Sequence, residues 1–119
     1  MFSAPEPMLT PLAVPPITPS NIQSYTVANG QMYILVIAVV ARQATTPTKG
    51  LSYYIIASFL VSSAGAITKI GSYNTTFNSN FTTASVTIDI ATANTVKVNV
   101  SGEAATNISW KSTITEYTV

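Results

Sequence analysis

Apolar and polar residues alternate along much of the chain beyond residue 24, and this alternation predicts β-strands rather than helices. The clearest case is the stretch VKVNVSG, in which Val96, Val98 and Val100 share one face of the predicted strand while polar residues occupy the other. One face of this strand therefore needs a hydrophobic core, whereas the other face meets water or a partner.

The pattern as a whole predicts an all-β fold, with seven or eight strands separated by turn signals. This arrangement is typical of an antiparallel β-sandwich, either jelly-roll-like or immunoglobulin-like. The last predicted strand puts Ile108, Trp110, Ser112 and Ile114 on one face, so we expect Trp110 to lie in the core. The predicted strands cover residues 24–28, 31–42, 51–61, 66–70, 84–90, 95–101 and 107–118.

Turn-forming residues indicate how these strands are connected. The pair Asn29-Gly30 is a strong signal for a two-residue hairpin. Residues 92–94 are expected to close a second hairpin, whereas the polar stretches 43–50 and 71–80 predict exposed loops.

Two of the predicted strands are apolar on both faces, at residues 33–41 and 53–61. Each apolar run is about half the ~20 residues that a membrane-spanning helix needs, and both are rich in β-branched and aromatic residues. They hold more apolar surface than the interior of one small sandwich requires. We therefore expect self-association, as a homotrimer, to bury the surplus.

The first part of the chain differs in composition, because six of the seven prolines fall before residue 20. Proline disfavours helices and central strands, so residues 1–24 are predicted to form an extended, polyproline-like arm ahead of a β-sandwich domain at 25–119. A disordered tail is the alternative, but such tails are usually polar and charged. The arm instead carries apolar side chains that we expect to bind a neighbouring subunit or a larger assembly: Met8, Leu9, Leu12, Val14 and Ile17.

Composition narrows the function further. The sequence has no histidine and no cysteine, and only 8% of its residues are charged against a usual ~25%. We therefore expect no enzyme activity, no metal and no cofactor, and the scattered basic residues predict no nucleic-acid binding. A surface with so little charge favours association, so an assembly component is the expected class.

The carboxy-terminal third of the chain resembles a known group of proteins. A valine-alternating strand, then Gly102, a small polar run over 103–107, the sequence Ile108-Ser109-Trp110-Lys111 and a closing strand are similar to the end of small all-β domains in structural proteins of tailed bacteriophages. These include head decoration (cement) proteins and modules of tail fibres or adaptors. The resemblance implies a virion protein, commonly a homotrimer, with its amino-terminal segment anchored to the particle.

Three functions follow as expectations. The first is a cement protein on the capsid surface, whose arm binds the major capsid protein or another virion protein. The second places the chain in the tail as a short fibre or receptor-binding module, with Tyr73, Phe77 and Phe81 of the 71–82 loop recognising host carbohydrate. A fibre usually has a shaft of repeats, which this chain lacks. The third is a non-viral carbohydrate-binding module of similar shape.

Overall fold

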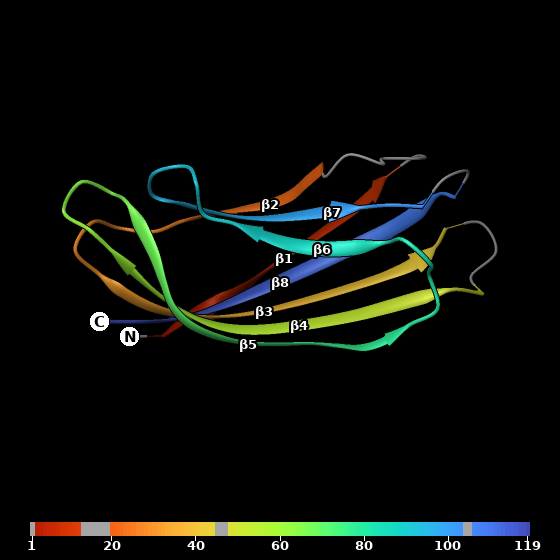
Figure 1. The fold of residues 1–119 in the computed structure, drawn as a ribbon, viewed down its shortest axis with the longest axis horizontal. Helices are drawn as coiled ribbons and strands as arrows, with labels where there is room; N and C mark the ends of the chain where they lie inside the picture. The colour runs from red at the N-terminus through yellow and green to blue at the C-terminus, as the bar shows by residue number, and fades with distance from the viewer. Residues whose placement is uncertain (1, 13–19, 45–47, 104–105) are drawn as a thin grey trace.

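The chain folds into two antiparallel β-sheets that pack as a sandwich, which confirms the predicted fold class (Figure 1). The computed structural model describes residues 2–12, 20–44, 48–103 and 106–119. Within them lie eight strands: β1 (Phe2–Leu12), β2 (Ser20–Thr26), β3 (Met32–Gln43), β4 (Gly50–Val61), β5 (Ile67–Ser79), β6 (Ser85–Asp89), β7 (Thr95–Ser101) and β8 (Ile108–Thr118).

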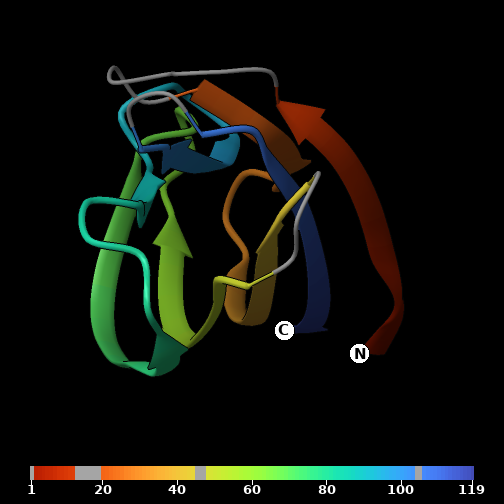
Figure 2. The same ribbon diagram turned by 90° about the vertical axis from the view of Figure 1, so that its right-hand side faces the viewer.

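The two sheets differ in size. Five strands form the larger sheet in the order β1-β8-β3-β4-β5, and three form the smaller sheet in the order β2-β7-β6. Figure 2 shows the molecule from one end, with β1 and β5 at opposite edges of the larger sheet. Long registers join β3 to β4 and to β8, so these three strands form the middle of the larger sheet.

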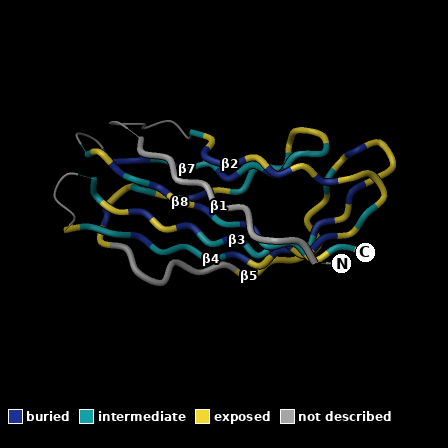
Figure 3. Tube along the Cα trace, turned by 180° about the vertical axis from the view of Figure 1, so that it is seen from behind, coloured by how far each residue is buried: buried dark blue, intermediate teal, exposed yellow. Residues whose placement is uncertain are grey.

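The core lies between the sheets and follows the predicted alternation. Val96, Val98 and Val100 of β7 are almost fully buried, and they belong to the same core cluster as Trp110, Ile108 and Ile114 of β8. The alternation of buried and exposed positions is visible along the strands in Figure 3. The largest fully buried side chains are Trp110, Phe59, Leu35, Ile37, Ile108 and Ile114.

Residues 2–12 correct one sequence-based expectation, because they form a strand that belongs to the larger sheet. β1 pairs antiparallel with β8, from Phe2 opposite Tyr117 to Leu12 opposite Ile108. Proline cannot donate to a sheet ladder, but an edge strand needs only one of its two sides paired. The expected start of the β domain at residue 25 falls inside β2. The anchoring role given to residues 1–24 stays a prediction.

Residues 71–79 are a second correction. The sequence predicts an exposed loop there, whereas the structure continues β5 from Ile67 to Ser79 along the edge of β4. Threonine favours strands, and an edge strand tolerates a polar sequence because little of it must be buried. The pairing contains two register irregularities, near Tyr53 and Phe59 of β4, and these interrupt the alternation that would have signalled one long strand.

One of the two hairpins predicted from the turn signals is present in the structure, and the other is not. Residues 92–94 connect β6 to β7 as an antiparallel hairpin, as expected. Asn29 and Gly30 do form a turn, but it carries the chain from β2 in the smaller sheet to β3 in the larger one. The hairpin prediction at this position is therefore wrong.

Candidate functional site: the outer face of the larger sheet

The most unusual surface of the described molecule is the side of the larger sheet that faces away from the core. We call it the outer face and define it by the outward-pointing residues of the three middle strands. These are Met32, Ile34, Val36, Ala38 and Val40 of β3, Ser52, Tyr54, Ile56, Ser58 and Leu60 of β4, and Lys111, Thr113, Thr115 and Tyr117 of β8.

Large apolar side chains are exposed on this face. Val40 is 49% exposed, Leu60 47% and Ile34 40%, although their sequence neighbours on the inner face are buried. An antiparallel sheet that meets water on one side normally carries polar residues there. The outer face therefore has the composition of a surface that another molecule covers.

The smaller sheet provides an internal comparison. Its outward positions are polar or charged, with Thr87 and Asp89 on β6, Lys97 and Asn99 on β7, and Ser24 on β2. The outward surface of the smaller sheet is therefore polar, as expected for contact with water, whereas the outer face of the larger sheet exposes large apolar residues.

Strand register joins the exposed apolar residues into a continuous band. Val36 lies opposite Ile56 of β4 on one side and Thr115 of β8 on the other. Ile56 in turn lies opposite Tyr73 of β5, which is 66% exposed. The apolar band therefore follows β3 along its length and crosses β4 to Tyr73 of β5, while Thr115 of β8 borders it on the other side.

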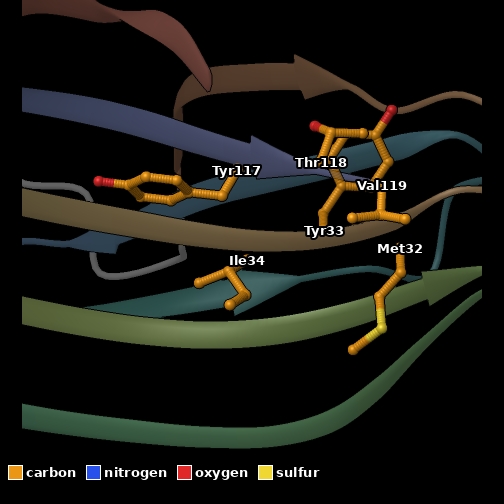
Figure 4. A pocket seen from close by; sticks show the side chains of 6 residues that line it. All are labelled: Met32, Tyr33, Ile34, Tyr117, Thr118 and Val119. Atoms are coloured by element: carbon orange, nitrogen blue, oxygen red, sulfur yellow. The ribbon is translucent and has the colours of Figure 1, made fainter. Parts of the chain in front are cut away.

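One end of the outer face is hollowed (Figure 4). The hollow has a volume of about 180 Å³ and is lined mainly by apolar atoms. Ligand pockets for drug-sized molecules measure roughly 300–1,000 Å³, whereas a cavity of about 150 Å³ can accept one benzene ring. The hollow is therefore about the size of a single aromatic side chain. Its lining residues are Met32, Tyr33, Ile34, Tyr117, Thr118 and Val119.

The opposite end of the outer face is positively charged. Lys111 lies opposite Val40, and Arg42 extends beyond it, where its guanidinium donates to the backbone carbonyls of Gln43 (3.4 Å) and Ala44 (3.3 Å). No carboxylate lies among the outer-face residues defined above. The face is thus apolar along its middle, cationic at one end and hollowed at the other.

Glu103, by contrast, has a structural role beneath the loop that precedes β6. Its carboxylate accepts hydrogen bonds from the backbone N–H groups of Thr83 (2.9 Å) and Thr82, and forms an ion pair with Lys49 at 3.2 Å. The hydrogen bond from Thr83 is the largest cause that holds the pKa of Glu103 below its ordinary value, and Lys49 adds to it. The Glu103 carboxylate therefore links the loop before β6 to Lys49 and has a structural role.

The two other described carboxylates also have structural partners. Glu116 accepts hydrogen bonds from the hydroxyls of Tyr25 and Thr118. Asp89 accepts one from the backbone N–H of Ala91 at 2.9 Å. Among the described residues, no cluster of three metal-ligating side chains occurs, and no helix is long and apolar enough to span a membrane.

Two of the three predicted recognition aromatics have side chains that the structure describes. Tyr73 is exposed on β5, whereas Phe81 is only 8% exposed and packs into the core. The side chain of Phe77 lies outside the described residues, so carbohydrate recognition stays a prediction.

The predicted arm contacts are likewise untested. Met8, Leu9 and Leu12 belong to β1, but their side chains lie outside the described part of the chain, and so do Val14 and Ile17 altogether. Sequence reasoning did not assign the outer face as a site. The available signal was the apolar character of residues 33–41 and 53–61 on both faces.

Comparison with known proteins adds one distant likeness. No protein-family model matches the sequence, and no curated protein matches it either. Among solved structures, the chain is similar to the tailspike protein of Acinetobacter baumannii phage AM24, with 12% identity and a TM-score of 0.43. The match covers 98% of this chain and 26% of the tailspike chain, so this chain spans about a quarter of that length. A likeness at this level carries no argument about function.

Proposed function

We propose that this chain is a non-enzymatic structural module of a bacteriophage particle, and that it docks through the outer face of its larger sheet. The observation that carries the proposal is the apolar band on β3 and β4, set against the polar surface of the smaller sheet. Burial of large apolar side chains is the main source of free energy in most protein association.

The chemistry of the chain supports a structural role. Asp89, Glu103 and Glu116 are held by hydrogen bonds within the fold, and the sequence offers neither histidine nor cysteine as a base or nucleophile. A docking surface needs area and shape, both of which a rigid sheet provides.

The bacteriophage assignment rests on the carboxy-terminal resemblance. Its two strands, β7 and β8, contribute Val96, Val98, Val100 and Trp110 to the core, so the resembling segment is central to the fold. We place the protein in the tail rather than on the capsid surface. A cement protein of the kind expected above needs a free arm, whereas residues 2–12 pair with β8 of the same chain.

Incorporation into particles tests the proposal. Phage particles assembled with a tagged chain are purified, and the copies per particle are counted for the wild type and for Ile56→Lys. The lysine introduces a charge on the exposed apolar band, so we expect incorporation to fall while the free protein keeps its β-sheet circular dichroism spectrum.

The matched control is Thr87→Lys, which adds the same charge on the polar surface of the smaller sheet. This variant should be incorporated like the wild type. Full incorporation of Ile56→Lys would contradict docking through the outer face. A copy number in the hundreds, instead of the few expected of a tail component, would move the protein to the capsid.

A further inference from the structure

We infer that the molecule that covers the outer face is a second copy of this chain, packed face to face with its strands antiparallel to those of the first. This inference rests on the proposed function, because it names the partner of the same surface. Two properties of the outer face lead to it, its area and the position of its charges, and the strand register then gives the residues that would meet.

The area fits an interface between two copies. Four strands at a spacing of ~4.8 Å span about 19 Å, and ten residues of strand extend about 33 Å. The sheet from β8 to β5 therefore presents roughly 600 Å² in projection, and side chains add relief to that plane. Each partner in a standard stable interface buries about 800 Å².

The strand register gives the residues that would meet across a two-fold axis at the middle of the sheet. Ile37 of β3 lies opposite Ile114 of β8. Lys111 and Tyr117 each lie three residues from Ile114, on opposite sides of it, and both point outward. We place a two-fold axis between the two copies, perpendicular to the strands and level with the Ile37–Ile114 pair. This axis reverses the strand direction, so Lys111 of each copy lies over Tyr117 of the other.

The same axis aligns the apolar band with itself. Val40 and Ile34 each lie three residues from Ile37, so each packs against the other across the interface. Val36 and Ala38 flank the axis and meet in the same way. Isologous packing requires this kind of self-complementarity, in which one patch serves both partners.

The charges select this orientation over a parallel one. If the copies packed with their strands parallel, Arg42 and Lys111 of every copy would gather at one end, with no carboxylate among the outer-face residues to offset them. Like charges brought together at an interface oppose association. In the antiparallel arrangement each cationic end lies against the end that carries Tyr117 and the apolar hollow, where a cation can stack on an aromatic ring.

Cross-linking distinguishes the two orientations. The chain has no cysteine, so Lys111→Cys and Tyr117→Cys each introduce one thiol at an exposed outer-face position. The purified variants are mixed and treated with a short bis-maleimide. Tagging one variant with a mass label allows mixed and self-linked dimers to be separated.

We expect the mixture to give dimers that join residue 111 to residue 117, while Tyr117→Cys alone links to itself poorly. Efficient self-linking of Tyr117→Cys would indicate a parallel assembly, such as the homotrimer predicted from sequence, and would overturn the inference. Thr87→Cys, on the smaller sheet, is the control and should give no more than random collisions.

Sedimentation of the full chain supplies an independent measurement. A dimer mass is expected for the wild type at micromolar concentration. Ile34→Lys should raise the dissociation constant of the dimer by about tenfold or more, because it replaces an apolar side chain that the interface buries in both copies. Thr87→Lys should leave the mass unchanged.

A monomer at all concentrations, or a dimer that Ile34→Lys does not weaken, would overturn the inference. Neither result would by itself overturn the proposed function, since the outer face would then bind a different particle protein. Failure of the function is read separately, as unchanged incorporation of Ile56→Lys into particles.

Discussion

Trp110 is the largest fully buried side chain of the core, and it also carries a polar N–H group that has no hydrogen-bond partner. Its side chain is fully buried on the inner face of β8, yet its indole Nε1–H has no hydrogen-bond partner. A buried donor without an acceptor costs about 1–3 kcal/mol. Two substitutions separate these opposing effects.

Trp110→Ala should lower the free energy of unfolding by about 3–5 kcal/mol, because it leaves a large cavity. Trp110→Phe should cost clearly less, since a ring still fills much of the space and the unpaired N–H is removed. Chemical denaturation of both variants measures the difference. Equal losses for the two variants would contradict this account, because the phenyl ring would then stabilise the core no more than a methyl group.

Glu103 gives the fold a dependence on pH. The pKa of this carboxyl is lowered from its ordinary value of 4.5, first by the hydrogen bond from Thr83. A lowered folded-state pKa means that the stabilisation is present above the unfolded-state pKa and is lost as pH falls through the folded-state pKa.

We therefore expect wild-type stability to decline below about pH 4.5, and Glu103→Gln to be less stable at pH 7 with a shallower acid decline. Denaturant titrations from pH 7 down to the acid range test this. Parallel pH profiles for the two proteins would show that Glu103 is not the group responsible.

At the scale of elements, three turns meet at one end of the sandwich around Asn94. Its side-chain amide donates to the carbonyl of Val27 (2.9 Å) and to Oδ1 of Asn29 (2.7 Å), while its backbone N–H donates to the carbonyl of Gly65 (2.9 Å). Gly65 has a φ of +92°, and a Cβ there would collide with the Asn94 side chain. These contacts tie the β6–β7 hairpin to the ends of β2 and β4.

Gly65→Ala should destabilise the protein by more than the ~1–2 kcal/mol that a left-handed backbone conformation costs a residue with a Cβ. The clash must also displace Asn94 from its partners. Ala64→Gly, at the exposed position one residue earlier in the same turn, is the control and should change stability little. A loss for Gly65→Ala no larger than that of the control would contradict this account.

Sequence reasoning predicted the central elements better than the edges, for physical reasons. Strands such as β7 and β8 bury one face completely, so alternation is strict and Val96, Val98 and Trp110 were correctly placed in the core. Edge strands bury less and obey weaker rules, so the prolines of β1 and the polar second half of β5 both suggested that these segments were not strands.

Bulges limit prediction in a different way. The register of β2 against β7 shifts between Asn21 and Gln23, and as a result both Ile22 and Gln23 are buried. Gln23 then accepts a buried hydrogen bond from the hydroxyl of Ser112, which links the two sheets. A local irregularity of one residue leaves no signal in an alternation pattern, so this contact was unpredictable from the sequence.

For the molecule as a whole, the asymmetry between its two surfaces is the main result. The sequence showed that residues 33–41 and 53–61 are apolar on both faces, but it did not show that both strands lie side by side in one sheet. Because β3 pairs with β4, the outward apolar residues of the two strands lie side by side and form one band. The low total charge of the chain, +1 net, fits a surface that is covered in use.

The central claim, that the outer face is buried in the working assembly, is tested most directly by thiol protection. Val40→Cys on the outer face and Thr87→Cys on the smaller sheet are each labelled with a maleimide, in the free chain and in assembled particles. We predict that assembly slows labelling of Val40→Cys strongly and leaves Thr87→Cys accessible. Equal labelling of Val40→Cys in the free and assembled states would contradict the claim.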